Sequence, residues 1–303
     1  MGKIRKRKQP ESGLESKLKS SLETRPKSAR TTNGAIENLK DPYPIHARPN
    51  PEECRAVRDT LLALHGFPQE FAKYRRKSTD DAVELAQDAT GLPAEEESVL
   101  DGLVRTVLSQ NTTEANSQRA FASLKSAFPT WEDVCLAFNL VLSAGTKDVE
   151  DAIRCGGLAP TKASCIKNLL NCLLERRGKL CLEYLRDLSL DEIKSELSLF
   201  KGIGPKTVSC VLMFNLQRDD FPVDTHIFEI AKTIGWVPAF ADRNKTYLHL
   251  NRRIPKELMF DLNCLLYTHG KLCNKCTSKR GNQPNKTSCD NSCPLLKYCE
   301  RSV

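Results

Sequence analysis

The sequence predicts an all-α fold, and three features of it favour this class. Hydrophobic residues make up 40% of the chain but aromatic residues only 6%, so aliphatic side chains dominate the apolar positions. In several segments these side chains recur every three or four residues, as in an amphipathic helix. Alternation of apolar and polar residues never persists long enough to indicate a strand. Gly and Pro fall between the helical segments, where they end helices.

The predicted helices can be followed along the chain from their boundary residues. The first begins at Pro51, with Asn50 as its N-cap, and ends at Gly66. The next begins between Pro93 and Glu97 and carries an apolar stripe through Val107. Further helices are predicted at 115–127, 130–142, 148–154 and 161–175, and after Ser189, which has capping-box spacing to Glu192.

Basic charge is concentrated at the two ends of the chain. The net charge is +8, to which residues 1–40 contribute +7 and residues 267–303 contribute +5, so the part between them carries −4. Residues 1–45 have little apolar periodicity and are predicted to form a disordered basic tail. Such ends are typical of anion-binding surfaces, although a role in solubility alone stays open.

The ends of the sequence also bear on its location. No apolar run has the length of a membrane span, and no secretory signal is recognisable, so we expect no membrane association. The cluster Lys3, Arg5, Lys6, Arg7 and Lys8 favours the nucleus, with an organelle as the alternative. The thirteen cysteines are then expected to be reduced, and most of the scattered ones to be buried.

The segment 199–212 carries the most specific pattern. Gly202 and Gly204 bracket Ile203, and a proline follows at a position suited to the first turn of a helix. This order predicts a helix, a tight glycine-rich turn and a second helix. Such a turn can bind a DNA phosphate through backbone N–H groups without reading the base sequence, although many ordinary helix connections also contain Gly and Pro.

Two side chains near this turn are candidates for covalent chemistry. Lys206 lies in the first turn of the second helix, where the helix dipole disfavours a cation and so favours the neutral amine that attacks a sugar carbon. Asp224 precedes the next helix, where it can serve as a catalytic carboxylate, as an N-cap, or as both. A solvated lysine and a simple N-cap are the alternatives for this pair.

Five cysteines lie within the last 31 residues, and their density indicates a metal centre. Four thiolates can hold either zinc or an iron–sulfur cluster, and composition does not separate the two. The spacing along the chain is Cys273-x2-Cys276-x12-Cys289-x3-Cys293-x5-Cys299.

These motifs resemble the endonuclease III branch of the helix-hairpin-helix DNA glycosylases. The resemblance rests on Gly-Ile-Gly-Pro-Lys-Thr at 202–207, Val-Asp-Thr-His at 223–226 and Leu-Ser-Gln-Asn-Thr-Thr at 108–113. The stretch from Phe221 to Pro238 is also similar to DEMETER-type plant 5-methylcytosine glycosylases. The resemblance covers about residues 50–303 and implies Lys206 as the nucleophile and Asp224 as the catalytic carboxylate.

The resemblance also implies the other site residues. Gln110 would fill the space left by a flipped nucleotide, and Asn111, Gly202, Ile203, Gly204 and Thr207 would contact double-stranded DNA. A [4Fe–4S] cluster is preferred over zinc, because Cys293-x5-Cys299 and the preceding His269-Gly270 pair match the family pattern. The chain departs from that pattern by a longer first gap and by x3 in the middle. The expected ligands are Cys273, Cys289, Cys293 and Cys299, with Cys276 as the alternative first ligand.

The resemblance finally implies an architecture and an activity. We expect two helical lobes with the DNA cleft between them: a central lobe at 99–218 with the hairpin, and a second lobe of 46–98 plus 219–303 with the cysteine loop at 273–299. The expected protein is a monomeric glycosylase and abasic-site lyase that acts on oxidised pyrimidines such as thymine glycol. The alternatives are a 5-methylcytosine glycosylase and a non-catalytic helix-hairpin-helix DNA-binding module.

Overall fold

The computed structural model describes residues 41–75, 97–139, 144–273, 275–276 and 293–299. All regular secondary structure in these ranges is helical, so the predicted all-α class is confirmed. None of the helices in the same ranges is long and apolar enough to span a membrane. Most of the predicted basic tail, residues 1–40, lies outside the described residues.

The first of two hydrophobic clusters is formed by side chains between Val99 and Leu216. Its helix α3 packs against α4, α7 and α9, and Leu103, Leu108 and Ile166 are completely buried there. Because these side chains come from the apolar stripes seen in the sequence, hydrophobic burial explains the packing. The helices are α3 (Val99–Leu108), α4 (Glu114–Ala127), α5 (Trp131–Asn139), α6 (Ala144–Ala152), α7 (Ala159–Arg177), α8 (Leu190–Leu197) and α9 (Pro205–Cys210).

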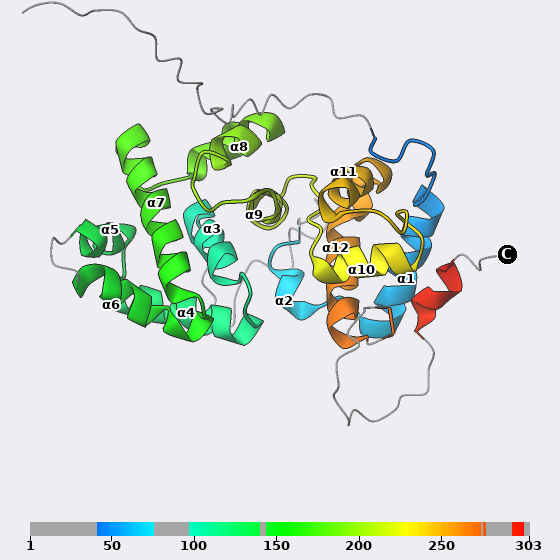
Figure 1. The fold of residues 1–303 in the computed structure, drawn as a ribbon, viewed down its shortest axis with the longest axis horizontal. Helices are drawn as coiled ribbons and strands as arrows, with labels where there is room; N and C mark the ends of the chain where they lie inside the picture. The colour runs from blue at the N-terminus through cyan, green and yellow to red at the C-terminus, as the bar shows by residue number, and fades with distance from the viewer. Residues whose placement is uncertain (1–40, 76–96, 140–143, 274, 277–292, 300–303) are drawn as a thin grey trace, which may run out of the picture. The chain divides into compact units, whose positions relative to one another are not determined.

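The second cluster combines a segment before this region with the segment after it. Helix α12 packs against both α1 and α10 (Figure 1), and Trp236 and Phe221 are completely buried in this cluster. The chain therefore leaves the second cluster after α1 and returns to it before α10. Its helices are α1 (Pro51–His65), α10 (Thr225–Thr233), α11 (Arg243–Arg253) and α12 (Lys256–Leu272), and the short helix α2 (Gln69–Ala72) follows α1 without a buried side chain. The lobe boundaries at 98/99 and 218/219 stay predictions.

Helix boundaries set by local capping agree with the sequence. Asn50 and Glu53 form a reciprocal capping box at α1, and Gly66 ends this helix with a φ of 66°. Ser189 and Glu192 form the same arrangement at α8. Such caps depend only on residues within one turn, so their signature can be read from the sequence.

Other boundaries differ from the prediction. The start predicted for α3 is too early, because Glu97 is not helical and Ser98 is the N-cap, accepting from the Asp101 N–H. The helix predicted at 148–154 begins at Ala144 and ends at Ala152, and a short 3-10 turn follows. The helix predicted at 130–142 is helical to Asn139, and 140–143 lie outside the described residues.

Candidate active site and metal centre

The glycine-rich turn lies between α8 and α9 as predicted. Gly202 has a φ of 96°, and a Cβ placed there would lie 2.7 Å from Sγ of Cys165, so both the backbone and the space require glycine. The Ile203 side chain is 8% exposed and packs into the first cluster, while its N–H donates to the Phe200 carbonyl at 3.0 Å. Ile203 thus anchors the turn from inside.

Lys206 and Asp224 line the same cavity, of about 520 Å³. Lys206 is the second residue of α9 and its side chain is exposed. Asp224 is half-buried and is the N-cap of α10, where its Oδ1 accepts from the Ile227 N–H at 2.8 Å. The capping interpretation of Asp224 is therefore correct, and it leaves the second carboxylate oxygen available to the cavity. The side chain of His226, two residues after Asp224, packs against Gly270 on α12.

Gln110 lies beside the hairpin although 97 residues separate it from Thr207 in the sequence. Its Nε2 donates to Oγ1 of Thr207 at 3.1 Å, so the polar loop after α3 and helix α9 are joined directly. Asn111 follows in a left-handed conformation, with a φ of 51°, and is exposed. The structure thus brings together Gln110 and Thr207, while Asn111 points its side chain to solvent.

Lys162 holds the base of the Gln110 loop, a role that the sequence did not reveal. Its side chain is only 2% exposed, and its ammonium donates to the carbonyls of Leu108 at 2.7 Å and Gly156 at 2.8 Å. Burial lowers its pKa from the usual lysine value. A cation at the last carbonyls of α3 also complements the dipole of that helix.

We expect Lys162→Met to destabilise the fold by about 1–3 kcal/mol, because two buried carbonyls lose their donor. Urea denaturation measures this difference. The matched change Lys179→Met alters an exposed lysine and is expected to leave the free energy of unfolding within about 0.5 kcal/mol. Equal stability of the two variants would contradict the clamping role.

A buried carboxylate fixes α9 from the opposite side. Asp220 is 1% exposed and accepts from Ser209 Oγ at 2.6 Å and from Tyr247 OH at 3.0 Å. Ser209 donates to Oδ1, whereas Tyr247 donates to Oδ2, and Nζ of Lys194 also lies 2.8 Å from Oδ2. Burial alone would lower the pKa of Lys194, but the Asp220 carboxylate raises it above its usual value. The group links α8, α9 and α11, and no local sequence pattern indicates it.

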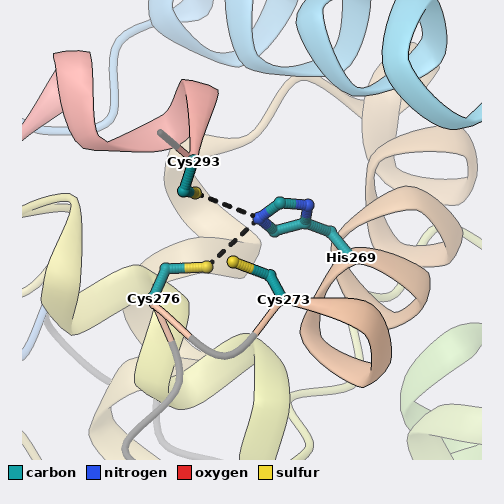
Figure 2. Close-up of side chains that lie close together, drawn as sticks. All are labelled: His269, Cys273, Cys276 and Cys293. Atoms are coloured by element: carbon teal, nitrogen blue, oxygen red, sulfur yellow. Dashed lines mark hydrogen bonds between the residues drawn. The ribbon is translucent and has the colours of Figure 1, made fainter. Parts of the chain in front are cut away.

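Four side chains of the C-terminal region converge as a possible metal centre: His269, Cys273, Cys276 and Cys293 (Figure 2). One ligand atom from each lies within 4.8 Å of the others. Nε2 of His269 is 3.1 Å from Sγ of Cys276 and 3.3 Å from Sγ of Cys293. Thiolates and imidazole bind zinc, and thiolates bind iron–sulfur clusters, so this donor set fits a metal group.

The sequence left Cys273 and Cys276 as alternatives for the first ligand, and the structure places both of them among the four converging side chains. Cys276 is 1% exposed, and Cys273 is half-buried. The contact between Cys276 and Cys293 lowers the pKa of the Cys293 thiol below its usual value and raises that of Cys276. Cys299 is half-buried and lies outside the converging four, and Cys289 lies outside the described residues.

The sequence pattern indicates His269 only as part of the His-Gly pair that precedes the cysteines, yet its side chain lies inside the cysteine group. It is 2% exposed, and its Nδ1 lies 2.9 Å from Nε2 of His65 on α1. Its place in the last turn of α12 directs it toward the cysteines. The His-Gly pair was therefore a signal that could have been followed to this side chain.

Comparison with known proteins agrees with this arrangement. The family model of the HhH-GPD superfamily of base excision DNA repair proteins matches residues 104–256. An Arabidopsis thaliana protein named as a DNA glycosylase is 61% identical over 271 residues, covering 87% of this chain and 90% of that protein. The Arabidopsis DNA glycosylase/AP lyase ROS1 is 30% identical over 176 residues, covering 52% of this chain but only 12% of that protein.

A solved structure supports the fold independently. A non-covalent complex of endonuclease III with DNA superposes with a TM-score of 0.58 and 21% identity, covering 83% of this chain and 96% of that one. This likeness confirms the predicted two-lobed helix-hairpin-helix fold, with a cysteine cluster near the C-terminus. The chain belongs to the HhH-GPD superfamily of base excision DNA repair proteins.

Proposed function

We propose that this protein is a DNA glycosylase with abasic-site lyase activity that acts on oxidised pyrimidines. One observation carries the proposal: Lys206 and Asp224 line one cavity, an amine nucleophile and a carboxylate facing the same space. The name of ROS1, a DNA glycosylase/AP lyase at 30% identity, supports the combination of the two activities.

The chemistry would begin with extrusion of the target nucleotide, because the sugar carbon is inaccessible inside the base stack. The Lys206 amine would form a bond to C1′, and the C1′–N bond would break, with its electron pair leaving on the base, which takes up a proton. Asp224 would stabilise the positive charge that develops on the sugar. The nitrogen would then lose a proton, and its electron pair would form the C1′=N bond of a Schiff base while the C1′–O4′ bond breaks and O4′ takes up a proton. Loss of a proton from C2′ would expel the 3′ phosphate by β-elimination and so cleave the strand.

DNA would be held by two polar elements that lie next to each other, the hairpin turn and the Gln110 loop. Backbone N–H groups of the turn at Gly202 and Gly204, with Thr207, would bind phosphate, which positions the duplex without reading its sequence. The Ile203 N–H donates within the turn, so Ile203 would contribute by shaping it. Gln110 and Asn111 would enter the duplex where the flipped nucleotide has left. We further propose a monomer located in the nucleus; the basic cluster at residues 3–8 that supports this location lies outside the described residues.

A second substrate is favoured by a specific similarity. The chain is 30% identical to ROS1 over 176 residues and resembles the DEMETER-type 5-methylcytosine glycosylases, so 5-methylcytosine is the second candidate base. The remaining alternative, a DNA-binding module without catalysis, would leave the amine and the carboxylate in the cavity without a role.

Product release from duplexes that each carry one defined base tests the function. We expect release and strand cleavage with oxidised pyrimidines, and covalent trapping when borohydride is added to protein and abasic-site DNA. Release from 5-methylcytosine alone would select the second substrate. DNA binding without release or trapping would leave only the binding module.

We also propose that the cysteine group holds a [4Fe–4S] cluster, with zinc as the alternative. Cys293 and Cys299 would contribute ligands together with Cys289 and either Cys273 or Cys276. When bound, the cluster would link α12 to the C-terminal turn through metal–thiolate bonds, so its main effect would be on folding.

Metal analysis checks this assignment. We expect iron with acid-labile sulfide in the purified protein, and loss of both in Cys293→Ala. The control is Cys54→Ala: burial raises the pKa of this thiol to about 12, so it stays protonated and should not bind metal. Zinc without sulfide in the wild-type protein would exclude the cluster.

A further inference from the structure

Helix α9, which carries Lys206, is too short to fix its own orientation. It has 6 residues and continues directly into a π-helical turn, Val211–Asn215, and a helix of this length depends on tertiary contacts for its stability. Lys206 and Cys210, one helical turn apart, line the cavity. Ser209 is 1% exposed, and its hydroxyl donates to Oδ1 of Asp220 at 2.6 Å. This buried contact is therefore one through which the protein sets the direction of α9.

A strap, residues 220–224, joins this contact to the carboxylate that lines the cavity. The Phe221 N–H donates to Oδ1 of Asn251 at 2.8 Å, and the Phe221 carbonyl accepts from Nδ2 of the same amide at 3.1 Å. The Pro222 carbonyl accepts from Nδ2 of Asn263 at 2.8 Å. Side chains of α11 and α12 therefore hold the backbone of the strap, and its last residue is the N-cap of α10.

The Asp220 carboxylate is buried beside a cation that balances its charge. Nζ of Lys194 lies 2.8 Å from Oδ2 of Asp220, and Tyr247 donates to the same oxygen at 3.0 Å. Nζ of Lys194 also donates to the Tyr247 hydroxyl at 3.2 Å. Because these contacts use Oδ2, the Ser209 hydroxyl can be removed from Oδ1 while the ion pair stays intact. Loss of this hydroxyl therefore leaves no buried charge unpaired.

We propose that Ser209 and Asp220 are positioning residues for the reaction, because their hydrogen bond holds the Lys206 helix against the strap and so sets the distance from the amine to the Asp224 carboxylate. This inference rests on the proposed function and adds to it two residues that touch neither the base nor the sugar. Placement matters because a displacement of about 1 Å can cost about a hundredfold in rate.

Ser209→Ala and Tyr247→Phe form a matched pair, since each removes one hydroxyl that donates to Asp220. Protein in excess is mixed with abasic-site DNA, and borohydride is added at successive times to follow Schiff-base formation. In Ser209→Ala we expect the rate at saturating protein to fall at least about tenfold. Tyr247→Phe should keep the wild-type rate, because the contact of Ser209 with Oδ1 remains.

DNA binding is measured separately with a duplex that carries a tetrahydrofuran abasic analogue, which cannot form a Schiff base. The Kd of Ser209→Ala should stay within about twofold of wild type, because affinity is spread over many phosphate contacts. Each variant loses one buried hydrogen bond, so urea denaturation should show similar losses of stability. At saturating protein the rate reports only folded molecules, so a loss of stability alone leaves it unchanged.

The wild-type protein separates this inference from the proposed function. Absence of trapping in wild type overturns the proposed function itself. Trapping in wild type with an unchanged rate in Ser209→Ala overturns the inference and leaves the function standing. Equal losses of rate in Ser209→Ala and Tyr247→Phe, or a loss of DNA affinity as large as the loss of rate in Ser209→Ala, also contradict it, because the network would then support only the fold or DNA binding.

Discussion

Replacing Lys206 with glutamine is expected to abolish borohydride trapping and to reduce strand cleavage at abasic sites by at least about a thousandfold. The physical reason is that the amide cannot form the covalent bond to the sugar on which both results depend. The side chain is exposed, so the substitution should leave the fold intact. Gel analysis of reduced protein–DNA mixtures measures trapping, and single-turnover kinetics measure cleavage.

Lys201→Gln is the matched control, since Lys201 is a second exposed lysine in the same hairpin. This variant should bind DNA somewhat more weakly, in a salt-dependent way, because one positive charge is lost. It should still be trapped at saturating protein. Trapping that survives in Lys206→Gln, or disappears in both variants, would remove Lys206 from the nucleophile's role.

Gly270→Ala is expected to destabilise the protein by about 3 kcal/mol or more, the upper range for overpacking a core. A Cβ at Gly270 would lie 2.4 Å from Cβ and 2.9 Å from Cγ of His226, where α10 packs against α12. The two helices must separate to admit the methyl group. Because Asp224 is the N-cap of α10, we expect base release to fall together with stability.

Gly204→Ala provides the control for this stability measurement. A Cβ at Gly204 would meet no atom within 4 Å, and its φ is −92°, a value that alanine adopts freely. Urea denaturation should therefore show a change within about 0.5 kcal/mol. Similar stability of the Gly270→Ala and wild-type proteins would mean that α10 and α12 separate without cost, and the packing argument would be wrong.

The fold was predictable where short-range rules act. The caps at Asn50 and Ser189 and the glycine turn at 202–204 were located from the sequence, because each depends on neighbours within a few residues. Helices α11 and α12 were not delimited. Helix α11 is mostly polar along its length, and α12 is buried on more than one face, so neither shows a single clean apolar stripe.

The sequence by itself determined the helical class, located the glycine-rich turn, placed Asp224 at the start of a helix, and singled out Lys206 as a candidate nucleophile. Only the tertiary structure placed that amine and that carboxylate on one cavity, buried Lys162 under the Gln110 loop, and brought Cys276 and His269 into the cysteine group. The reason is physical. A cap or a turn is fixed by the backbone within one helical turn, whereas these contacts join groups from distant segments and exist only after the helices have packed.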